Sequence, residues 1–405
     1  MLSILPNVIS GPRCRLDKRA SISFKAFSGR PDTVPTFGRV LSPDDLARLS
    51  TEETMSLPVP FQLPVIDISA LYQQDPAGWL QAAEALGGAA RESGFCYVTG
   101  HRVSPQLIGR LLQQTTTFFA LPIEQKMKWY IGHSRNHRGY VPEGEEVFAA
   151  GTRDRKEAFD LGLDLPPDAA EVRAGNPMLG PNVWPDLDGF REAVNAYYQS
   201  VLELGRTLFR GFALALGLEE DRFARLVNRP PSQLRLIHYP YNPDAEDSMG
   251  IGAHTDYECF TILLPTAPGL EVMNGAGVWV DAPPVPGSFV VNIGDMFETW
   301  TNGEFVATSH RVRRVREERY SFPLFCVCDY DTLVEPLPHF VGPDRPRKYP
   351  SVSAGAHLFA QTAQSFQYLK QRLARGELAL PSSSLPLSSF GQEARHKAAE
   401  GSGQP

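Results

Sequence analysis

The spacing of hydrophobic residues along the chain changes near residue 231. Before this point, apolar residues recur at intervals of three, four and seven, which is typical of amphipathic helices. The strongest pattern, over 188–216, predicts one long helix with Asp188 as its N-cap and Gly217 as its stop. The shorter predicted elements are helices at 77–92 and 106–119 and strands at Pro64–Ile68, Phe95–Val98 and Lys156–Leu163.

After residue 231 the pattern becomes one of short apolar runs separated by Gly, Pro and Asn turns. Such even spacing is typical of a β-sandwich, jelly roll or barrel. A last helical pattern covers 356–373. We therefore expect an α+β protein with a mainly β core. The predicted strands are Leu234–Tyr239, Cys259–Leu264, Leu270–Met273, Val278–Asp281, Ser288–Ile293, Val306–Val312 and Tyr320–Cys328.

These patterns divide the chain into four parts. Residues 1–57 are predicted to be a flexible N-terminal extension, 58–230 an α/β part that includes the long helix, 231–375 the β core with its C-terminal helix, and 376–405 a disordered tail. The extension carries several basic residues ahead of most of its acidic ones, which weakly resembles an organelle transit peptide. A non-catalytic extension or an upstream start codon is the alternative.

The composition argues against some classes of protein but does not indicate a particular function. The 405 residues are 42% hydrophobic and 21% charged, as in ordinary globular proteins. A net charge of −7 gives no electrostatic reason to expect nucleic acid or anionic membranes as partners. No stretch approaches the eighteen or so apolar residues of a membrane span. The five cysteines are scattered, which favours reduced thiols. We expect a cytoplasmic protein, either a monomer or a weak homodimer.

The first candidate for chemistry is the segment His254-Thr255-Asp256. Side chains two residues apart on a strand point to the same face. An imidazole nitrogen and a carboxylate oxygen side by side supply two of the three ligands in a facial Fe(II) site. The segment alone predicts a metal pair and leaves open the third ligand.

His310 is the best candidate for that third ligand. Period-two alternation in Ala307–Arg313 places His310 and Val312 inward and the flanking arginines outward. An inward histidine is also a common core residue with one satisfied hydrogen bond, and that is the alternative. The presence of His254 and Asp256 in the same β region favours the ligand.

Arg319 and Ser321 lie on one strand face shortly after His310. An inward arginine in an apolar strand is costly unless an anion neutralises it, and a carboxylate is its natural bidentate partner. No acidic residue with matching inward alternation is evident, which favours a bound anion as the partner. A surface salt bridge at the start of the strand is the alternative.

Together these residues resemble the isopenicillin N synthase-like branch of the Fe(II)/2-oxoglutarate-dependent oxygenases. The resemblance covers Leu63–Arg375 and rests on the ordered set of His254-Thr255-Asp256, His310 and Arg319-Tyr320-Ser321. Further matching segments are Pro64–Ser69, Gly94–Val98, Arg138–Tyr140, Gly180–Pro185 and Asn292–Asp295.

The resemblance implies a double-stranded β-helix (jelly roll) with flanking helices. It implies that His254, Asp256 and His310 ligate Fe(II), and that Arg319, Ser321 and Tyr239 bind the distal carboxylate of 2-oxoglutarate. Many plant members have an asparagine where this chain has Ile237, which removes one polar group near the cosubstrate. The family uses O2, is commonly stimulated by ascorbate, and couples the conversion of 2-oxoglutarate to succinate and CO2 with oxidation of a small molecule.

Hydroxylation is the expected outcome, although desaturation and ring closure occur in the same family. One alternative is an iron oxidase that does not use 2-oxoglutarate, as in isopenicillin N synthase or aminocyclopropane-carboxylate oxidase. A non-catalytic β-sandwich binding module is the second. The candidates for substrate contact are Tyr257 and Phe297, which are near the ligands in sequence, and Arg138 and Tyr140 on a loop that could form a lid.

Overall fold

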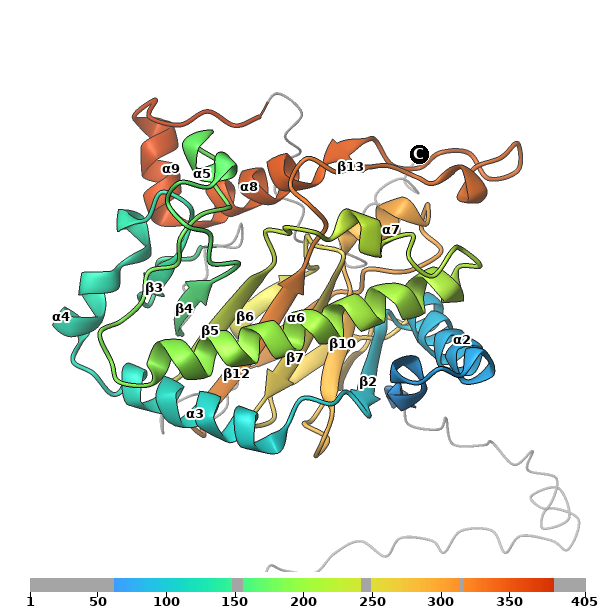
Figure 1. Cartoon of the computed structure of the whole chain (residues 1–405), viewed down its shortest axis with the longest axis horizontal. Helices are drawn as coiled ribbons and strands as arrows, with labels where there is room; N and C mark the ends of the chain where they lie inside the picture. Colours follow the sequence, from blue (N-terminus) through green and yellow to red (C-terminus); the bar gives the residue numbers. More distant parts are fainter. Residues whose placement is uncertain (1–61, 148–155, 242–248, 314–315, 382–405) are drawn as a thin grey trace, which may run out of the picture. The chain divides into compact units, whose positions relative to one another are not determined.

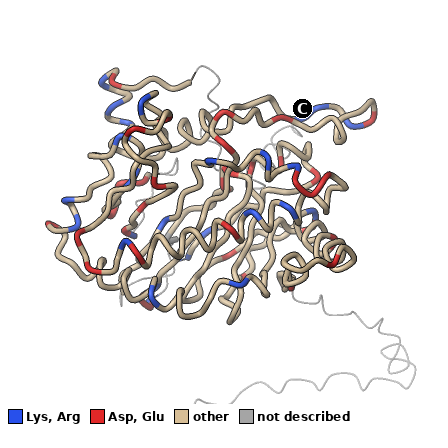
Figure 2. The backbone as a smooth tube through the Cα atoms, in the orientation of Figure 1, with Lys and Arg blue, Asp and Glu red and all other residues tan. Residues whose placement is uncertain are grey.

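The computed structural model describes residues 62–147, 156–241, 249–313 and 316–381, with the backbone alone at 249–250. These residues belong to one compact unit that begins at residue 60. The predicted extension 1–57 lies outside the described residues, as does the predicted tail beyond residue 381. None of the described helices is long and apolar enough to cross a membrane. Basic and acidic residues are interspersed along the described chain (Figure 2).

Two β-sheets form the centre of the unit (Figure 1). The large sheet has the strand order β1-β2-β10-β7-β12-β5-β4-β3, and the small sheet has the order β6-β11-β8-β9. Strands from both sides of residue 230 therefore hydrogen-bond in one sheet. The strands are β1 (Val65–Asp67), β2 (Phe95–Thr99), β3 (Gly139–Val141), β4 (Glu157–Leu161), β5 (Gln233–Tyr239), β6 (Met249–His254), β7 (Phe260–Pro265), β8 (Leu270–Met273), β9 (Trp279–Asp281), β10 (Phe289–Ile293), β11 (His310–Arg313), β12 (Arg319–Cys326), β13 (Leu333–Val334) and β14 (Val352–Ser353).

Helices flank the sheets, and the longest, α6, runs across the strands of the large sheet (Figure 1). Its aromatic face packs on that sheet: the rings of Phe209 and Phe260 lie 4.7 Å apart, and those of Tyr197 and Phe322 6.3 Å apart. The helices are α2 (Pro76–Glu92), α3 (Pro105–Phe119), α4 (Ile123–Lys126), α5 (Ala170–Arg173), α6 (Phe190–Ala215), α7 (Asp295–Trp300), α8 (Ala354–Ser365) and α9 (Gln367–Ala374).

Period-two alternation decides which side chains of the large sheet face α6. On β12, Phe322 and Leu324 are fully buried in the main hydrophobic cluster, whereas Arg319 and Ser321 line a cavity. On β7, Phe260 and Ile262 belong to that cluster, whereas Thr261 and Leu263 line the cavity. The large sheet therefore separates an apolar layer under α6 from a cavity on its other face that polar and apolar side chains line together.

The predicted strands after residue 231 all occur, with ends that shift by a few residues. The largest shift is at β11, which begins only at His310 rather than at residue 306. α6 begins at Phe190 with Gly189 as its N-cap, so the prediction of Asp188 as the cap was wrong. Gly189 has φ 78°, a left-handed conformation that favours glycine. Gly217, the predicted stop, also has a positive φ of 68°.

The predicted C-terminal helix over 356–373 is in fact two helices, α8 and α9, separated by Phe366. Phe366 has extended backbone angles, and its ring lies 4.4 Å from that of His137 and 5.3 Å from the guanidinium carbon of Arg235. The break therefore places this ring against the cavity wall. The short helix α7 was not predicted, and β6 was predicted only as a strand that carries His254, without bounds.

Candidate metal centre

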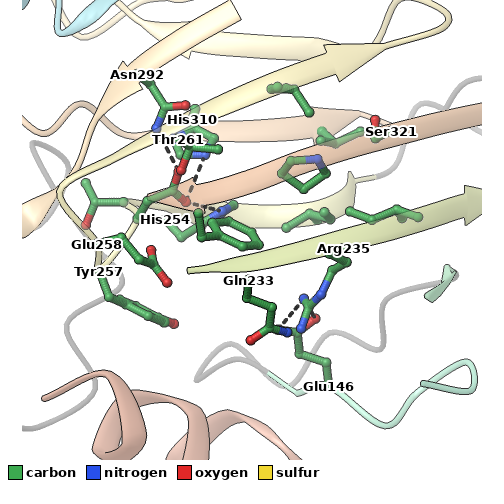
Figure 3. Close-up of a pocket in the computed structure, with 18 of the residues that line it drawn as sticks. Glu146, Gln233, Arg235, His254, Tyr257, Glu258, Thr261, Asn292, His310 and Ser321 are labelled. Carbon is green, nitrogen blue, oxygen red and sulfur yellow. Dashed lines mark hydrogen bonds and ion pairs between the residues drawn. The ribbon is translucent and has the colours of Figure 1, made fainter. Parts of the chain in front are cut away.

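A cavity lies between residues of both sheets and α8 (Figure 3). One part of its wall holds a cluster of His254, Asp256 and His310, whose potential ligand atoms all lie within 4.8 Å of one another. Asp256 Oδ1 is 3.7 Å from His254 Nε2 and 3.5 Å from His310 Nε2. Two imidazoles and one carboxylate converging on one point form a donor set that could hold a divalent transition metal.

Strand pairing brings the two histidines together. His310 on β11 is the direct antiparallel partner of His254 on β6, and their ring centroids are 4.3 Å apart. Asp256 lies two residues beyond the end of β6, so the prediction that it shares a strand with His254 was wrong. The carboxylate reaches the same point because the chain turns immediately after the strand.

Hydrogen bonds fix the orientation of each donor. His254 Nδ1 lies 2.8 Å from the Gly252 carbonyl oxygen, and His310 Nδ1 lies 3.2 Å from that of Thr308, which directs both Nε2 atoms to Asp256. Asp256 Oδ2 accepts hydrogen bonds from Asn292 Nδ2, at 2.7 Å, and from Thr261 Oγ1. Oδ1 is thereby directed to the histidines, and such outer contacts are typical of metal ligands.

The segment that carries Asp256 is held against the turn between β10 and α7. Backbone N–H groups of Asp295 and Met296 donate to the carbonyls of Asp256 and Glu258, at 2.9 Å and 3.1 Å. A Cβ at Gly294 would lie 2.3 Å from the Glu258 carbonyl oxygen, so this close approach requires glycine. The loop after β6 is therefore positioned by backbone contacts independent of its side chains.

The electrostatics favour the protonation state that a metal needs. Burial, and then the neighbouring His310, lower the pKa of His254 to about 4. Burial alone would raise the pKa of Asp256, but the two histidines, Thr261 and Asn292 lower it. Neutral imidazole and ionised carboxylate are the forms that bind metal ions.

Arg319 and Ser321 line the same cavity from β12 and are both buried. Arg319 Nε donates to the Ala267 carbonyl oxygen at 3.2 Å, and its guanidinium carbon lies 4.8 Å above the ring of Tyr239, its cross-strand partner. Arg319 Nη1 and Ser321 Oγ have no hydrogen-bond partner among the described residues. Burial lowers the pKa of Arg319, and Tyr239 opposes this only in part.

Another part of the wall is an ion-pair network. Arg235 on β5 forms a bidentate pair with Asp160 on β4, at 2.8 Å and 2.9 Å, and a further pair with Glu146 at 3.0 Å. Lys156 also pairs with Glu146 at 3.0 Å. Although burial opposes it, Arg235 and then Lys156 lower the pKa of Glu146 to about 2.

The predicted substrate residues separate into two groups. Tyr257 lines the cavity, whereas Arg138, Tyr140 and Phe297 are absent from its lining. Arg138 is fully buried and donates to the backbone carbonyls of Asn136, His137 and Met178.

Tyr140 lies on β3 and donates to Glu157 Oε2, and Phe297 packs against Phe260 and Phe212 under α6. The predicted lid loop contains β3, a buried strand at the edge of the large sheet, and the three residues lie outside the cavity lining, so the structure gives no support for their contact with a substrate.

Several cavity residues were missed by sequence reasoning. Thr261 and Asn292 are polar positions within the apolar runs of β7 and β10, and this was the signal that could have placed them inward. Glu146, Arg235 and Glu258 also line the cavity. Burial, and then repulsion from Asp256, raise the pKa of Glu258 to about 8.

Comparison with known proteins identifies the family. Residues 63–187 match the non-haem dioxygenase in morphine synthesis N-terminal family, and residues 230–327 match the 2OG-Fe(II) oxygenase superfamily. A 2-oxoglutarate-Fe(II) type oxidoreductase of Emericella nidulans is 34% identical over 301 residues, which cover 72% of this chain and 86% of the relative. The chain belongs to the 2OG-Fe(II) oxygenase superfamily. A homoarginine-6-hydroxylase of Oryza sativa is 36% identical over 325 residues, 75% of this chain and 97% of that protein.

Solved structures agree with this assignment to the 2OG-Fe(II) oxygenases. A 2OG-Fe(II) oxygenase family protein from Caulobacter crescentus has a TM-score of 0.65 and 32% identity, covering 77% of this chain and 98% of its own. A full-length Neurospora crassa protein in complex with alpha-KG and thymine has a TM-score of 0.63 and 27% identity, covering 78% and 97%. These likenesses confirm the predicted α+β fold, a jelly-roll β core with flanking helices. The protein is an Fe(II)/2-oxoglutarate-dependent dioxygenase.

Proposed function

We propose that His254, Asp256 and His310 are the three protein ligands of Fe(II). The observation that carries this proposal is the convergence of their donor atoms, each aimed by a separate hydrogen bond. These residues would hold Fe(II) through two imidazole nitrogens and one carboxylate oxygen, the donor set typical of non-haem Fe(II) oxygenases. Within the described residues, this is the group of histidine and acidic side chains whose spacing suits a metal ion.

We propose that Arg319, Ser321 and Tyr239 hold the distal carboxylate of 2-oxoglutarate. Arg319 Nη1 and Ser321 Oγ are buried donors that no described residue satisfies, and a carboxylate would accept from both. Tyr239 supports the guanidinium by stacking beneath it. Ile237, the departure from many plant members, also lines the cavity and offers no polar group.

The remaining cavity would hold a small-molecule substrate, and hydroxylation is the proposed outcome. When bound, iron and 2-oxoglutarate supply an oxidation driven by the release of succinate and CO2. The chain itself orients the ligands and excludes water with apolar side chains such as Phe95, Leu263 and Val312. The relatives differ in the small molecules that their names give, homoarginine in one and thymine in another, so they do not select a substrate here.

Removing one metal ligand tests the iron site. We expect Asp256→Ala and His310→Ala to abolish specific binding of Fe(II), measured without oxygen, and to lower succinate formation by about a thousandfold or more. His339→Ala, which removes an exposed histidine outside the cavity, is the matched control and should change neither quantity. Specific iron binding by Asp256→Ala with full turnover would contradict the ligand assignment.

Four finer properties are also proposed. The motifs quoted above support the isopenicillin N synthase-like branch, and ascorbate is expected to stimulate turnover. We also propose that the enzyme is cytoplasmic and that it is a monomer or weak homodimer. Sedimentation analysis of the full chain would test the oligomeric state.

A further inference from the structure

The buried acidic residues of the described chain differ in whether the protein satisfies them. Six acidic side chains are buried. Five of them accept hydrogen bonds or form ion pairs with other residues: Glu146, Glu157, Asp160, Asp256 and Glu298. Glu258 is the sixth. Among the described residues, the hydrogen bond found for its carboxyl group comes from its own backbone N–H.

Glu258 lines the cavity that holds the metal centre, and only 6% of its surface is exposed. Figure 3 shows its carboxyl group beside Tyr257, on the same side of the cavity as His254. Its backbone is held by Met296 N–H at 3.1 Å, so the side chain is presented from a fixed loop. Arg235 acts on it electrostatically but is already paired with Asp160 and Glu146.

A structural role accounts poorly for such a group. A buried carboxylate without a cation or several donors destabilises the folded protein, and the other five buried acids show how this chain avoids that cost. The buried unpaired donors of Arg319 are the opposite case, a cation that awaits an anion. Glu258 is likewise a buried group that the protein does not pair: burial raises its pKa, which favours the neutral acid in the empty cavity, and a positively charged group beside it would favour the carboxylate.

The formal charges of the loaded site lead to the same conclusion. Fe(II), ionised Asp256, 2-oxoglutarate and Arg319 cancel one another. The network of Arg235, Lys156, Glu146 and Asp160 also cancels. Glu258 lies outside both sets, so its buried carboxyl group is left to face the substrate, and a monocation beside it would favour the ionised form.

We propose that Glu258 is a specificity-determining residue and that the substrate carries a basic nitrogen, as an amine, amidine or guanidinium group, bound by the Glu258 carboxylate. This inference rests on the proposed function, because it places the substrate in the cavity beside the iron. Ion pairing between a carboxylate and a basic nitrogen would fix the substrate's orientation relative to the metal.

Matched pairs of cationic and neutral probes test this proposal. The full chain is loaded with Mn(II), which prevents turnover, and with 2-oxoglutarate. Binding of L-arginine against L-citrulline, and of benzylamine against benzyl alcohol, is measured by calorimetry and by the shift in melting temperature. We expect at least one cation to bind about tenfold or more tightly than its neutral counterpart, and Glu258→Gln to remove that preference.

Two controls keep the outcomes separate. Glu203→Gln removes an acid on the exposed face of α6 and should keep the preference for cations. 2-Oxoglutarate should raise the melting temperature of both the unmodified protein and Glu258→Gln. If it did not do so in the unmodified protein, the proposed function would be contradicted rather than the role of Glu258. A preference for neutral probes, no preference at all, or a cation preference that persists in Glu258→Gln would overturn the proposal. So would a large fall in melting temperature of Glu258→Gln without ligands, because it would show a structural partner.

Discussion

Two buried arginines on neighbouring strands line the same cavity, and the protein treats them in opposite ways. Arg235 on β5 is 7% exposed and forms hydrogen-bonded ion pairs with Asp160 and Glu146. Arg319 on β12 is 1% exposed; its Nε donates to a carbonyl and Tyr239 lies beside the guanidinium, but Nη1 has no partner in the described chain. Both residues are buried arginines, so they differ in whether the protein itself supplies acidic partners for the guanidinium.

This difference separates stability from function. A buried cation whose partners belong to the protein holds β4, β5 and the Glu146 segment together. A buried cation whose partners are absent costs free energy in the empty protein, and that cost is recovered only when an anion binds. Unsatisfied buried polar groups that line a cavity are thus a better indicator of a ligand site than burial or charge alone.

The first way to test the comparison is to remove Arg235. We expect Arg235→Met to lower the free energy of unfolding by about 3–5 kcal/mol, because Asp160 and Glu146 are left buried without their cation. Urea denaturation at neutral pH measures the loss. Arg225→Met, which removes an exposed arginine from a surface ion pair, should cost less than about 1 kcal/mol.

The affinity for 2-oxoglutarate should change little in the folded fraction of Arg235→Met. A stability close to that of the unmodified protein would show that the network around Arg235 is not what holds this part of the sheet. A strong loss of 2-oxoglutarate affinity at full stability would remove the distinction between the two arginines.

The second test removes Arg319, and the expected effect moves from stability to ligand binding. We expect Arg319→Met to raise the KM for 2-oxoglutarate by about 10- to 150-fold, as charge-assisted hydrogen bonds of 1.5–3 kcal/mol imply. Without ligands, its free energy of unfolding should be unchanged or higher. The stabilisation that 2-oxoglutarate gives the Mn(II)-loaded protein should disappear.

Arg319→Lys is the conservative variant and should recover part of the affinity, since it keeps the charge but loses bidentate geometry. If Arg319→Met instead unfolded the protein while leaving the KM of the folded fraction unchanged, Arg319 would be a structural residue like Arg235.

The same comparison explains what could be predicted from the sequence. His310, Arg319 and Ser321 were found because they alternate with apolar residues on strands, where period two fixes the face. Arg138 and Tyr140 were misplaced, because a polar pattern with Gly and Pro is typical of a loop. In the structure both are buried instead: the two terminal nitrogens of Arg138 donate to backbone carbonyls, and Tyr140 donates to Glu157.

The sequence could not predict which buried charged side chains find a partner within the protein. Arg235 sits in an apolar strand just as Arg319 does, and its acids lie 75 and 89 positions away along the chain. Glu258 follows the end of β6, where alternation no longer applies, so its direction into the cavity depends on tertiary contacts. Sequence patterns therefore predicted which faces are buried better than which polar groups remain unpaired.

Two buried serines allow the same comparison, with the smallest effect that we expect. Ser321 Oγ has no partner among the described residues, whereas Ser232 Oγ accepts from Val327 N–H at 3.1 Å and donates to the Val327 carbonyl oxygen. We expect Ser321→Ala to raise the KM for 2-oxoglutarate by about 2- to 15-fold, as the loss of one hydrogen bond from an uncharged donor implies, at unchanged or slightly higher stability.

Ser232→Ala should show the reverse, a loss of about 1–3 kcal/mol in unfolding free energy with an unchanged KM, because a backbone group is left buried and unpaired. Steady-state kinetics and urea denaturation on both variants measure the two quantities. If Ser321→Ala lost stability and kept its KM, the hydroxyl would have a partner within the protein. The unpaired donors on β12 would then no longer indicate a bound carboxylate, even with the Arg319 result in place.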